Sequence, residues 1–232
     1  GFNTLGFFKT DNEYEGHADQ SRVQGIVYSF SGDGHPMAGD LKFEDMNNDG
    51  YIDHGENTVG KPGDRKIIGN TTPRYAYGAN VGFNWRNFTV DVFLQGIGKR
   101  DFWPGPEAAV FWGFYNRWNQ PFMKHIDGNY WTPENPDAYF PRPRAYMAFN
   151  NTRSLGIVQT RYLQDASYLR LKNVSVGYSI PSRIVQKVRL NGVKFFFAGA
   201  NLLEFTKISP AFDPEGLSED RDTSQQNGNG FV

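Results

Sequence analysis

Residues Arg74–Trp85 read RYAYGANVGFNW, and this stretch decides the fold class. Alternate positions from Tyr75 to Trp85 are apolar, whereas the positions between them are small or polar. Such alternation is typical of a β-strand with one apolar face, and here rings occupy both ends of that face. Ten steps of about 3.4 Å span about 34 Å, and a tilt near 45° reduces this to about 24 Å, the height of the apolar band around a membrane barrel.

A second strand follows after the short turn Arg86-Asn87. From Phe88 to Leu94 apolar residues again alternate with other residues, which predicts a hairpin. The hairpin could belong to the wall of a barrel, or to a β-sandwich whose apolar face covers a core. The rings at both ends of the apolar face, and the small or polar residues on the opposite face, favour the barrel. We therefore expect an all-β chain that forms part of a large antiparallel transmembrane β-barrel with long extracellular loops.

Two more strands are indicated near the end of the chain. In residues 167–180 the apolar positions change parity between Leu171 and Val174, which suggests a bulge or a change of environment. Residues 193–203 again resemble a strand, and residues 181–190 resemble a short helical turn. With the short turns on the periplasmic side, the chain divides into an extracellular loop region (1–73), a barrel hairpin (74–98), a long aromatic extracellular loop (99–166), a strand pair with a short periplasmic helical turn (167–203) and a further extracellular loop (204–232).

The first loop region contains a calcium-loop pattern. Residues 45–56 read DMNNDGYIDHGE, which follows the twelve-residue EF-hand loop, with Gly50 at the sharp turn and Ile52 at the apolar position. Pro36 and Gly39 precede the loop and more glycines follow it, so its flanks are not helices. We expect a structural Ca²⁺ clip rather than a sensor; the alternative is an acidic turn without an ion. The candidate ligands are Asp45, Asn47, Asp49, Asp53 and Glu56 through side-chain oxygens, and Tyr51 through its carbonyl.

The loop at 99–166 is rich in aromatic residues. Long loops in compact domains are usually functional, and exposed rings can anchor an interface or stack on a substrate. The alternative is that the rings pack on one another and hold the loop in place. The residues that we predict to contact substrate or a partner are Trp112, Tyr115, Trp118 and Trp131.

Composition narrows the classes of function. Aromatic residues make up 16% of the chain while the mean hydropathy is −0.60, so rings carry much of the apolar surface. A net charge of −1 without a basic stripe argues against nucleic acid. The four histidines are scattered and no G-x-S-x-G motif occurs, so we do not expect an enzyme. A soluble calcium-dependent carbohydrate-binding β-module stays open as an alternative to a transporter.

Five motifs in order carry a family resemblance. They are GDLKFEDMNNDGYIDHGE, DRKIIGNTTPRYAYGANVGFNWRNFTVDVFLQG, WTPENPDAYFPR, YLRLKNVSVGYSIPSRIV and GVKFFFAGANLLEFTKISPAFDPE. Together they resemble the C-terminal quarter of a SusC/RagA-type TonB-dependent outer-membrane transporter. The resemblance implies a plugged barrel in the outer membrane of a Gram-negative bacterium, surrounded by membrane lipid and energised by TonB through a plug absent from this chain. It also implies a SusD-like surface lipoprotein that captures glycans or peptides, and a last barrel strand beyond residue 232.

One departure from the family pattern concerns the metal loop. In the family, the acid at the twelfth loop position is followed at once by Arg, whereas here Glu56 is followed by Asn57. An Asp-Arg pair occurs only later, as Asp64-Arg65. Either Glu56 or Asp64 could complete the metal shell; local spacing favours Glu56.

Overall fold

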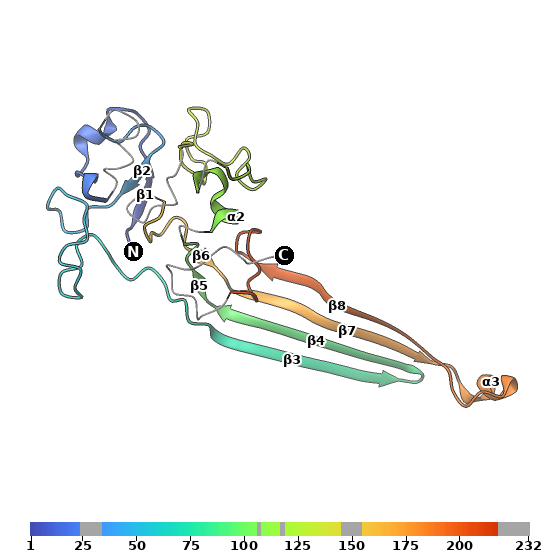
Figure 1. The fold of residues 1–232 in the computed structure, drawn as a ribbon. Coiled ribbons are helices and arrows are strands. Elements are labelled where there is room, and N and C mark those ends of the chain that lie inside the picture. The colour runs from blue at the N-terminus through green and yellow to red at the C-terminus, as the bar shows by residue number, and fades with distance from the viewer. Residues whose placement is uncertain (24–33, 106–107, 117–118, 145–154, 218–232) are drawn as a thin grey trace. The chain divides into compact units, whose positions relative to one another are not determined.

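The computed structural model describes residues 1–23, 34–105, 108–116, 119–144 and 155–217 (Figure 1). Its contacts divide the chain into two compact units, which we describe separately. The strand unit comprises Asn70–Asp101 and Asp165–Ile208. The loop unit comprises Gly1–Gly69, Phe102–Gln164 and the described residues from Ser209 onward.

The strand unit is one antiparallel sheet. Its strands are β3 (Arg74–Trp85), β4 (Phe88–Lys99), β7 (Tyr168–Ser179) and β8 (Lys194–Thr206), paired in the order β3-β4-β7-β8 (Figure 1). The four strands predicted from the sequence are confirmed. The sheet does not close on itself within the described residues, so β3 and β8 are its edges.

The register gives this sheet two chemically different faces. One cross-strand row joins Trp85, Phe88, Tyr178 and Phe195, and all four side chains lie on the same face. This apolar face is exposed at many positions, whereas a β-sandwich would cover it with a second sheet. Its other members are Tyr77, Ala79, Val81, Phe83, Val90, Val92, Leu94, Leu169, Leu171, Val174, Val176, Phe197, Leu203 and Phe205.

The opposite face, which we call the polar face, carries small and polar residues between a few rings. Asn80, Asn84, Asp91 and Ser175 are among its members. The predicted alternation is thus present across all four strands, not only in the first.

A β-bulge explains the change of parity in β7. Phe93 of β4 pairs with Asn173 and Leu94 pairs with Leu171, so Lys172 is an extra residue on β7. On the other side β8 adapts at Asn201, whose φ is +52°. The bulge keeps Leu171 and Val174 on the apolar face, and the predicted irregularity is confirmed.

The two connections at one end of the sheet are short. Arg86 takes a φ of +54° in the two-residue turn, and Asn87 donates from Nδ2 to the carbonyl of Ser179 at 2.7 Å. The β7–β8 connection contains α3 (Ser182–Val185) and η3 (Gln186–Val188), which confirms the predicted helical turn.

The loop unit has little regular structure. Its elements are β1 (Thr4–Phe7), η1 (Glu13–Gly16), β2 (Leu41–Phe43), α2 (Ala109–Trp112) and η2 (Gly113–Tyr115), and β1 pairs antiparallel with β2. Two further short strands, β5 (Asp101–Phe102) and β6 (Gln164–Asp165), pair with each other and have one residue each in the strand unit and in the loop unit. No helix in the described ranges is long and apolar enough to cross a membrane.

Three chain segments share the core of the loop unit. The backbone of Phe2 bonds to Val158 and Thr160, at 2.9 and 3.0 Å, which joins the first segment to the second. The ring of Phe212 lies 5.6 Å from that of Phe111, which adds the third segment. The largest fully buried side chains are Trp112, Tyr115, Tyr162, Phe2, Phe8, Phe43, Phe111, Phe140, Leu41, Ile52 and Ile126.

A Tyr–Gly pair lies near the other end of the sheet. Gly96 is paired with Tyr77, whose hydroxyl donates to the carbonyl of Tyr168 at 3.1 Å. A Cβ at position 96 would lie 2.3 Å from that carbonyl oxygen and 2.4 Å from the Tyr77 hydroxyl. The absence of a side chain at Gly96 therefore lets the Tyr77 ring cross β4.

We predict that Gly96→Ala destabilises the sheet by about 1–3 kcal/mol, because the added methyl group overlaps backbone atoms. The unfolding temperature of the full-length protein, followed by heat-dependent mobility in gels, measures the effect. Gly192→Ala is the matched control, since a Cβ there meets nothing within 4 Å. Equal unfolding temperatures for the two variants would contradict the prediction.

Candidate functional site

The candidate metal loop is held by its turn and by one buried side chain. Gly50 has a φ of +84°, and its carbonyl accepts the amide of Asp19 at 2.9 Å. The amide of Ile52 donates to Asp19 in return, at 2.8 Å, and the Ile52 side chain is fully buried. The two residues that the calcium pattern assigns to the turn and to the apolar anchor therefore have these roles in the structure.

The first candidate ligands are engaged with backbone amides. Asp45 accepts from Asn48 at 2.6 Å and from Gly50 at 2.9 Å, through its two oxygens. The Asn47 side-chain oxygen accepts from Asp49, and Asp49 accepts from Tyr51, at 3.0 and 2.9 Å. These bonds wind the segment tightly around its own carboxylates.

Two later candidate ligands are paired with cationic side chains. Asp53 accepts the amide of Gly55 at 2.7 Å and forms an ion pair with Arg22, whose guanidinium also lies 4.0 Å from the centre of the Tyr51 ring. The Gly55 amide and then Arg22 lower the pKa of Asp53, so this carboxylate stays ionised at neutral pH. The exposed carboxylate of Glu56 pairs with Lys61 at 2.6 Å.

Residues 55–63 form an excursion whose two ends meet. The amide of Asp64 donates to the carbonyl of Asp53 at 3.1 Å, and the amide of Glu56 donates to Lys61 at the same distance. Gly55 and Gly63 approach so closely that a Cβ on either would lie within 2.5 Å of the other's nitrogen. The chain therefore leaves the loop after Asp53 and rejoins it at Asp64.

Asp64 closes the loop at that point. It is fully buried, and its two oxygens accept the amides of Met46 and Asp53, each at 2.8 Å. Met46 and Asp53 lie at the two ends of the loop, so one carboxylate fastens both. Glu56, which local spacing favours, lies in solvent instead. Arg22 gave no signal in the sequence pattern, because 31 residues separate it from Asp53.

The donor atoms suit a hard cation, but their arrangement here serves the protein's own hydrogen bonds. Asp and Asn oxygens are the ligands that Ca²⁺ prefers. Across the ranges that the structure describes, no three His, Asp or Glu side chains gather closely enough to hold a metal ion. A carboxylate oxygen that accepts a backbone amide keeps a lone pair for a metal, so Asp45 and Asp49 need not lose these bonds, whereas Arg22 competes for Asp53.

The aromatic candidates lie inside the loop unit. Trp112 and Tyr115 are fully buried and Trp131 is 6% exposed, whereas Trp118 lies outside the described residues. Trp112 donates to the carbonyl of Gly105 at 2.9 Å, and Tyr115 donates to that of Pro141 at 2.6 Å. Burial raises the pKa of the Tyr115 phenol. The three described candidates therefore have packing roles in this structure; contact with a substrate or partner stays a prediction.

A different ring is available at the surface. Phe122 is 53% exposed and stacks on Phe114, with centroids 5.3 Å apart and planes 5° apart. Tyr130 meets Phe122 edge-on at 6.1 Å. The sequence alone did not select Phe122, because residue type does not tell which rings of an aromatic loop stay exposed.

We predict that Asp64→Asn loosens residues 45–64. The Asn side chain has one acceptor oxygen, so its NH₂ group would face one of the two backbone N–H donors that Asp64 accepts. A buried donor left unpaired costs about 1–3 kcal/mol. Hydrogen exchange of the full-length protein measures the local change. Glu56→Gln is the control and should leave exchange unaltered, because the Glu56–Lys61 pair is exposed. Faster exchange in the control than in Asp64→Asn would contradict the role assigned to Asp64.

Comparisons with known proteins identify relatives along most of the chain. No family model matches. "TonB-dependent receptor P3" of Formosa agariphila is 30% identical over 94% of this chain and 19% of its own length. "TonB-dependent receptor P26" of the same organism is 26% identical over 78% of this chain and 16% of its own length. The chain thus spans less than a fifth of these curated relatives.

Likeness to solved structures is weaker. The RagAB peptide importer in the "closed-closed" state aligns with a TM-score of 0.48 and 17% identity, over 89% of this chain and 19% of that one. Its "open-open" state aligns with a TM-score of 0.43 and 23% identity, over 67% and 15%.

The curated relatives agree with the family resemblance of the motifs. The predicted all-β, antiparallel fold class with long loops is confirmed, and the four strands form an open sheet within the described residues. As its SusC/RagA-type motifs indicate, the chain belongs to the TonB-dependent receptors.

Proposed function

We propose that the whole protein is a TonB-dependent transporter in the outer membrane of a Gram-negative bacterium. The observation that carries the proposal is the two-faced sheet, whose apolar face is exposed across four strands. In hydrocarbon such a face needs no cover, whereas in water it would favour aggregation. This is also the feature that argues against a soluble carbohydrate-binding module. The strand unit then forms barrel wall, and TonB acts through a plug that this chain does not contain.

The cargo that we propose is a glycan or a peptide, delivered by a SusD-like surface lipoprotein. The resemblance of the motifs suggests both partners. The loop unit supports the proposal because three segments share one core, which gives a rigid surface rather than three separate loops. Phe122, which stacks on the half-buried Phe114, is an exposed ring of this unit, of the kind that anchors interfaces.

We also propose that Ca²⁺ binds the loop that starts at Asp45. Support comes from the oxygen donors, from the left-handed Gly50 and from the buried Ile52. Asp45, Asn47, Asp49 and Asp53 would hold the ion, with Glu56 or Asp64 completing the set. A bound ion would supply positive charge among these carboxylates, which would order the loop. Arg22 forms an ion pair with the Asp53 carboxylate and would compete with the ion for it.

We predict that Phe122→Ala weakens association with the lipoprotein about tenfold and lowers uptake of glycan or peptide. The physical reason is that aromatic rings are enriched among the few interface residues whose truncation costs more than about 1 kcal/mol. Binding of the full-length protein to purified lipoprotein and uptake by cells measure both effects.

The matched control for that prediction is Leu5→Ala. Leu5 lies in the same unit and is 54% exposed, close to the 53% of Phe122. The control should retain binding and uptake. Wild-type values for Phe122→Ala in both assays would refute the contact role of this ring.

We predict that Ca²⁺ slows hydrogen exchange in residues 45–64 of the full-length protein, and that Arg22→Gln raises the Ca²⁺ affinity up to about fivefold. The gain is small because an ion pair in solvent is weak and screened by salt. Lys42→Gln is the control, since Lys42 pairs with Glu13 at 2.7 Å, away from the loop. No protection by Ca²⁺ in the wild type would exclude the ion, whereas weaker binding by Arg22→Gln would exclude the competition.

A further inference from the structure

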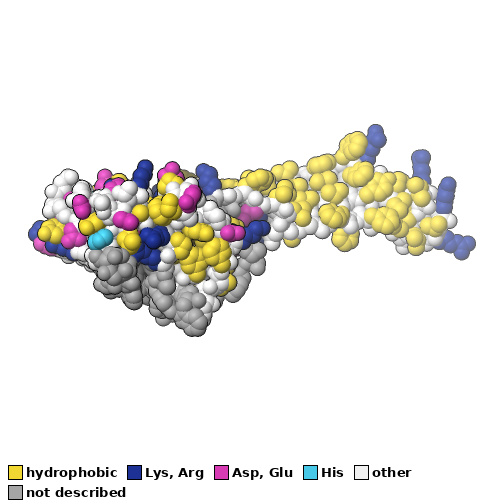
Figure 2. Space-filling model, turned by 90° about the horizontal axis from the view of Figure 1, so that it is seen from above, with side chains coloured by type: hydrophobic (Ala, Val, Ile, Leu, Met, Phe, Trp, Pro, Cys, Tyr) yellow, Lys and Arg dark blue, Asp and Glu magenta, His cyan; other side chains and the backbone are white. Residues whose placement is uncertain are grey.

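Positive charge is concentrated at the short-turn end of the strand unit. Residues 79–90 and 174–200 contain five Lys or Arg residues and no Asp or Glu. One of the five, Lys194, lies across Gly177 on the polar face. Figure 2 shows Lys and Arg side chains at the tip of the hydrophobic sheet. The remaining four, which we call the turn cations, are Arg86, Arg183, Lys187 and Arg189.

Exposed aliphatic side chains lie among the turn cations. Ile184, Val188 and Leu190 are 57%, 65% and 49% exposed. Arg183 and Lys187 alternate in the chain with Ile184 and Val188 along α3 and η3. The β7–β8 connection is therefore cationic and apolar at once.

This connection is a folded cap rather than an open loop. Arg189 ends the helical turn with a φ of +57°, and the amide of Leu190 donates to the carbonyl of Val185 at 3.1 Å. The Val185 side chain is buried, and the amide of Ile180 closes the connection by donating to Val193 at 2.9 Å. Its charges consequently have a defined place at the end of the sheet.

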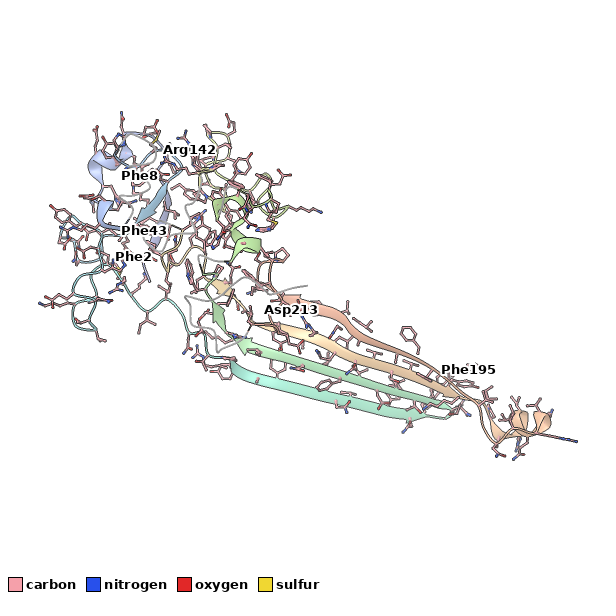
Figure 3. All side chains as sticks on the ribbon, viewed as in Figure 1. Phe2, Phe8, Phe43, Arg142, Phe195 and Asp213 are labelled. Atoms are coloured by element: carbon pink, nitrogen blue, oxygen red, sulfur yellow. The ribbon has the colours of Figure 1, made fainter. Side chains whose placement is uncertain are left out.

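The cap is continuous with the aromatic end of the apolar face. Trp85, Phe88, Tyr178 and Phe195 form one row there, and the Arg86 guanidinium lies 5.1 Å from the centre of the Trp85 ring. Phe195 marks this end of the sheet in Figure 3. The turn cations form no ion pair with a carboxylate of the described residues.

Aromatic rows of membrane proteins lie at the level of the lipid headgroups. Cations just beyond such a row meet the headgroup phosphates, and each cation near an anionic surface strengthens binding by about fivefold, equivalent to about 1 kcal/mol. We propose that the turn cations bind anionic phospholipid headgroups in the membrane leaflet at the short-turn end. An acidic protein segment could match the charges, but it would not account for the exposed aliphatic residues or for the continuity with the apolar face.

The inference rests on the proposed membrane insertion, and the experiment separates the two. The full-length protein is reconstituted into nanodiscs that contain phosphatidylcholine or phosphatidylglycerol brominated on the acyl chains. The part of the tryptophan fluorescence quenching that is lost in Trp85→Phe reports which lipids lie beside Trp85. We expect about fivefold stronger quenching by the anionic lipid, falling to no preference in R183Q/K187Q/R189Q and in high salt.

The control R74Q/K99Q/K207Q removes three charges from the opposite end of the same sheet and should keep the preference. Equal quenching by the two lipids in the wild type, or a preference that survives in R183Q/K187Q/R189Q, would overturn the inference. If R183Q/K187Q/R189Q kept the lipid preference but lost uptake, the inference would also be overturned, and the turn cations would instead be assigned to binding an acidic protein. No quenching by either lipid would show that Trp85 is not in the bilayer, and the proposed function would fail first. Heat-dependent gel mobility confirms that each variant is folded.

Discussion

The pairing of backbone amides and carbonyls across four antiparallel strands is the constraint on which the other features depend. Hydrocarbon offers no hydrogen-bond partner, so strands can cross a membrane only with every backbone group paired in a closed sheet. In the proposed barrel, the register decides which side chains face lipid, and a slip by one residue would exchange the two faces. The bulge at Lys172 shows this constraint locally, since it absorbs one residue and keeps Leu171 and Val174 on the apolar face.

The loop unit is stabilised by side-chain packing in a core rather than by a continuous sheet. The largest fully buried side chains of the loop unit are mostly aromatic rings. Phe111 alone is near four other aromatic side chains of the core, namely Trp112, Phe140, Tyr162 and Phe212. Rings bury much area per residue and their hydroxyl or N–H groups can reach loop carbonyls, as Trp112 and Tyr115 do. An aromatic loop therefore need not be a binding loop.

The strands could be predicted from the sequence because their period of two is a local property. The roles of single residues in the loop unit could not, since they depend on contacts between distant segments. Glu56 has the twelfth position of the calcium-loop pattern, yet it lies within the excursion of residues 55–63, and the spatial neighbour of Asp53 is Asp64. Such an insertion costs little free energy when its ends already meet. Counting along the chain cannot detect it. Likewise, Phe122 and Trp112 are both aromatic residues of one loop, and the sequence does not show that Trp112 is buried whereas Phe122 is exposed.

The metal loop and the aromatic core are coupled through Phe2. Its ring lies 5.6 Å from that of Phe43 and 5.1 Å from that of His54, which directly follows Asp53. Figure 3 labels Phe2 and Phe43. Its backbone meanwhile holds Val158 and Thr160 of the second segment. A change in how well the metal loop is ordered would therefore affect the core through His54 and Ile52. It would affect the second segment through the backbone of Phe2. Since buried contacts that share residues do not contribute independently, the loop and the core should gain or lose order together. The effect of an ion would then extend beyond the residues that bind it, to the surface formed by all three segments.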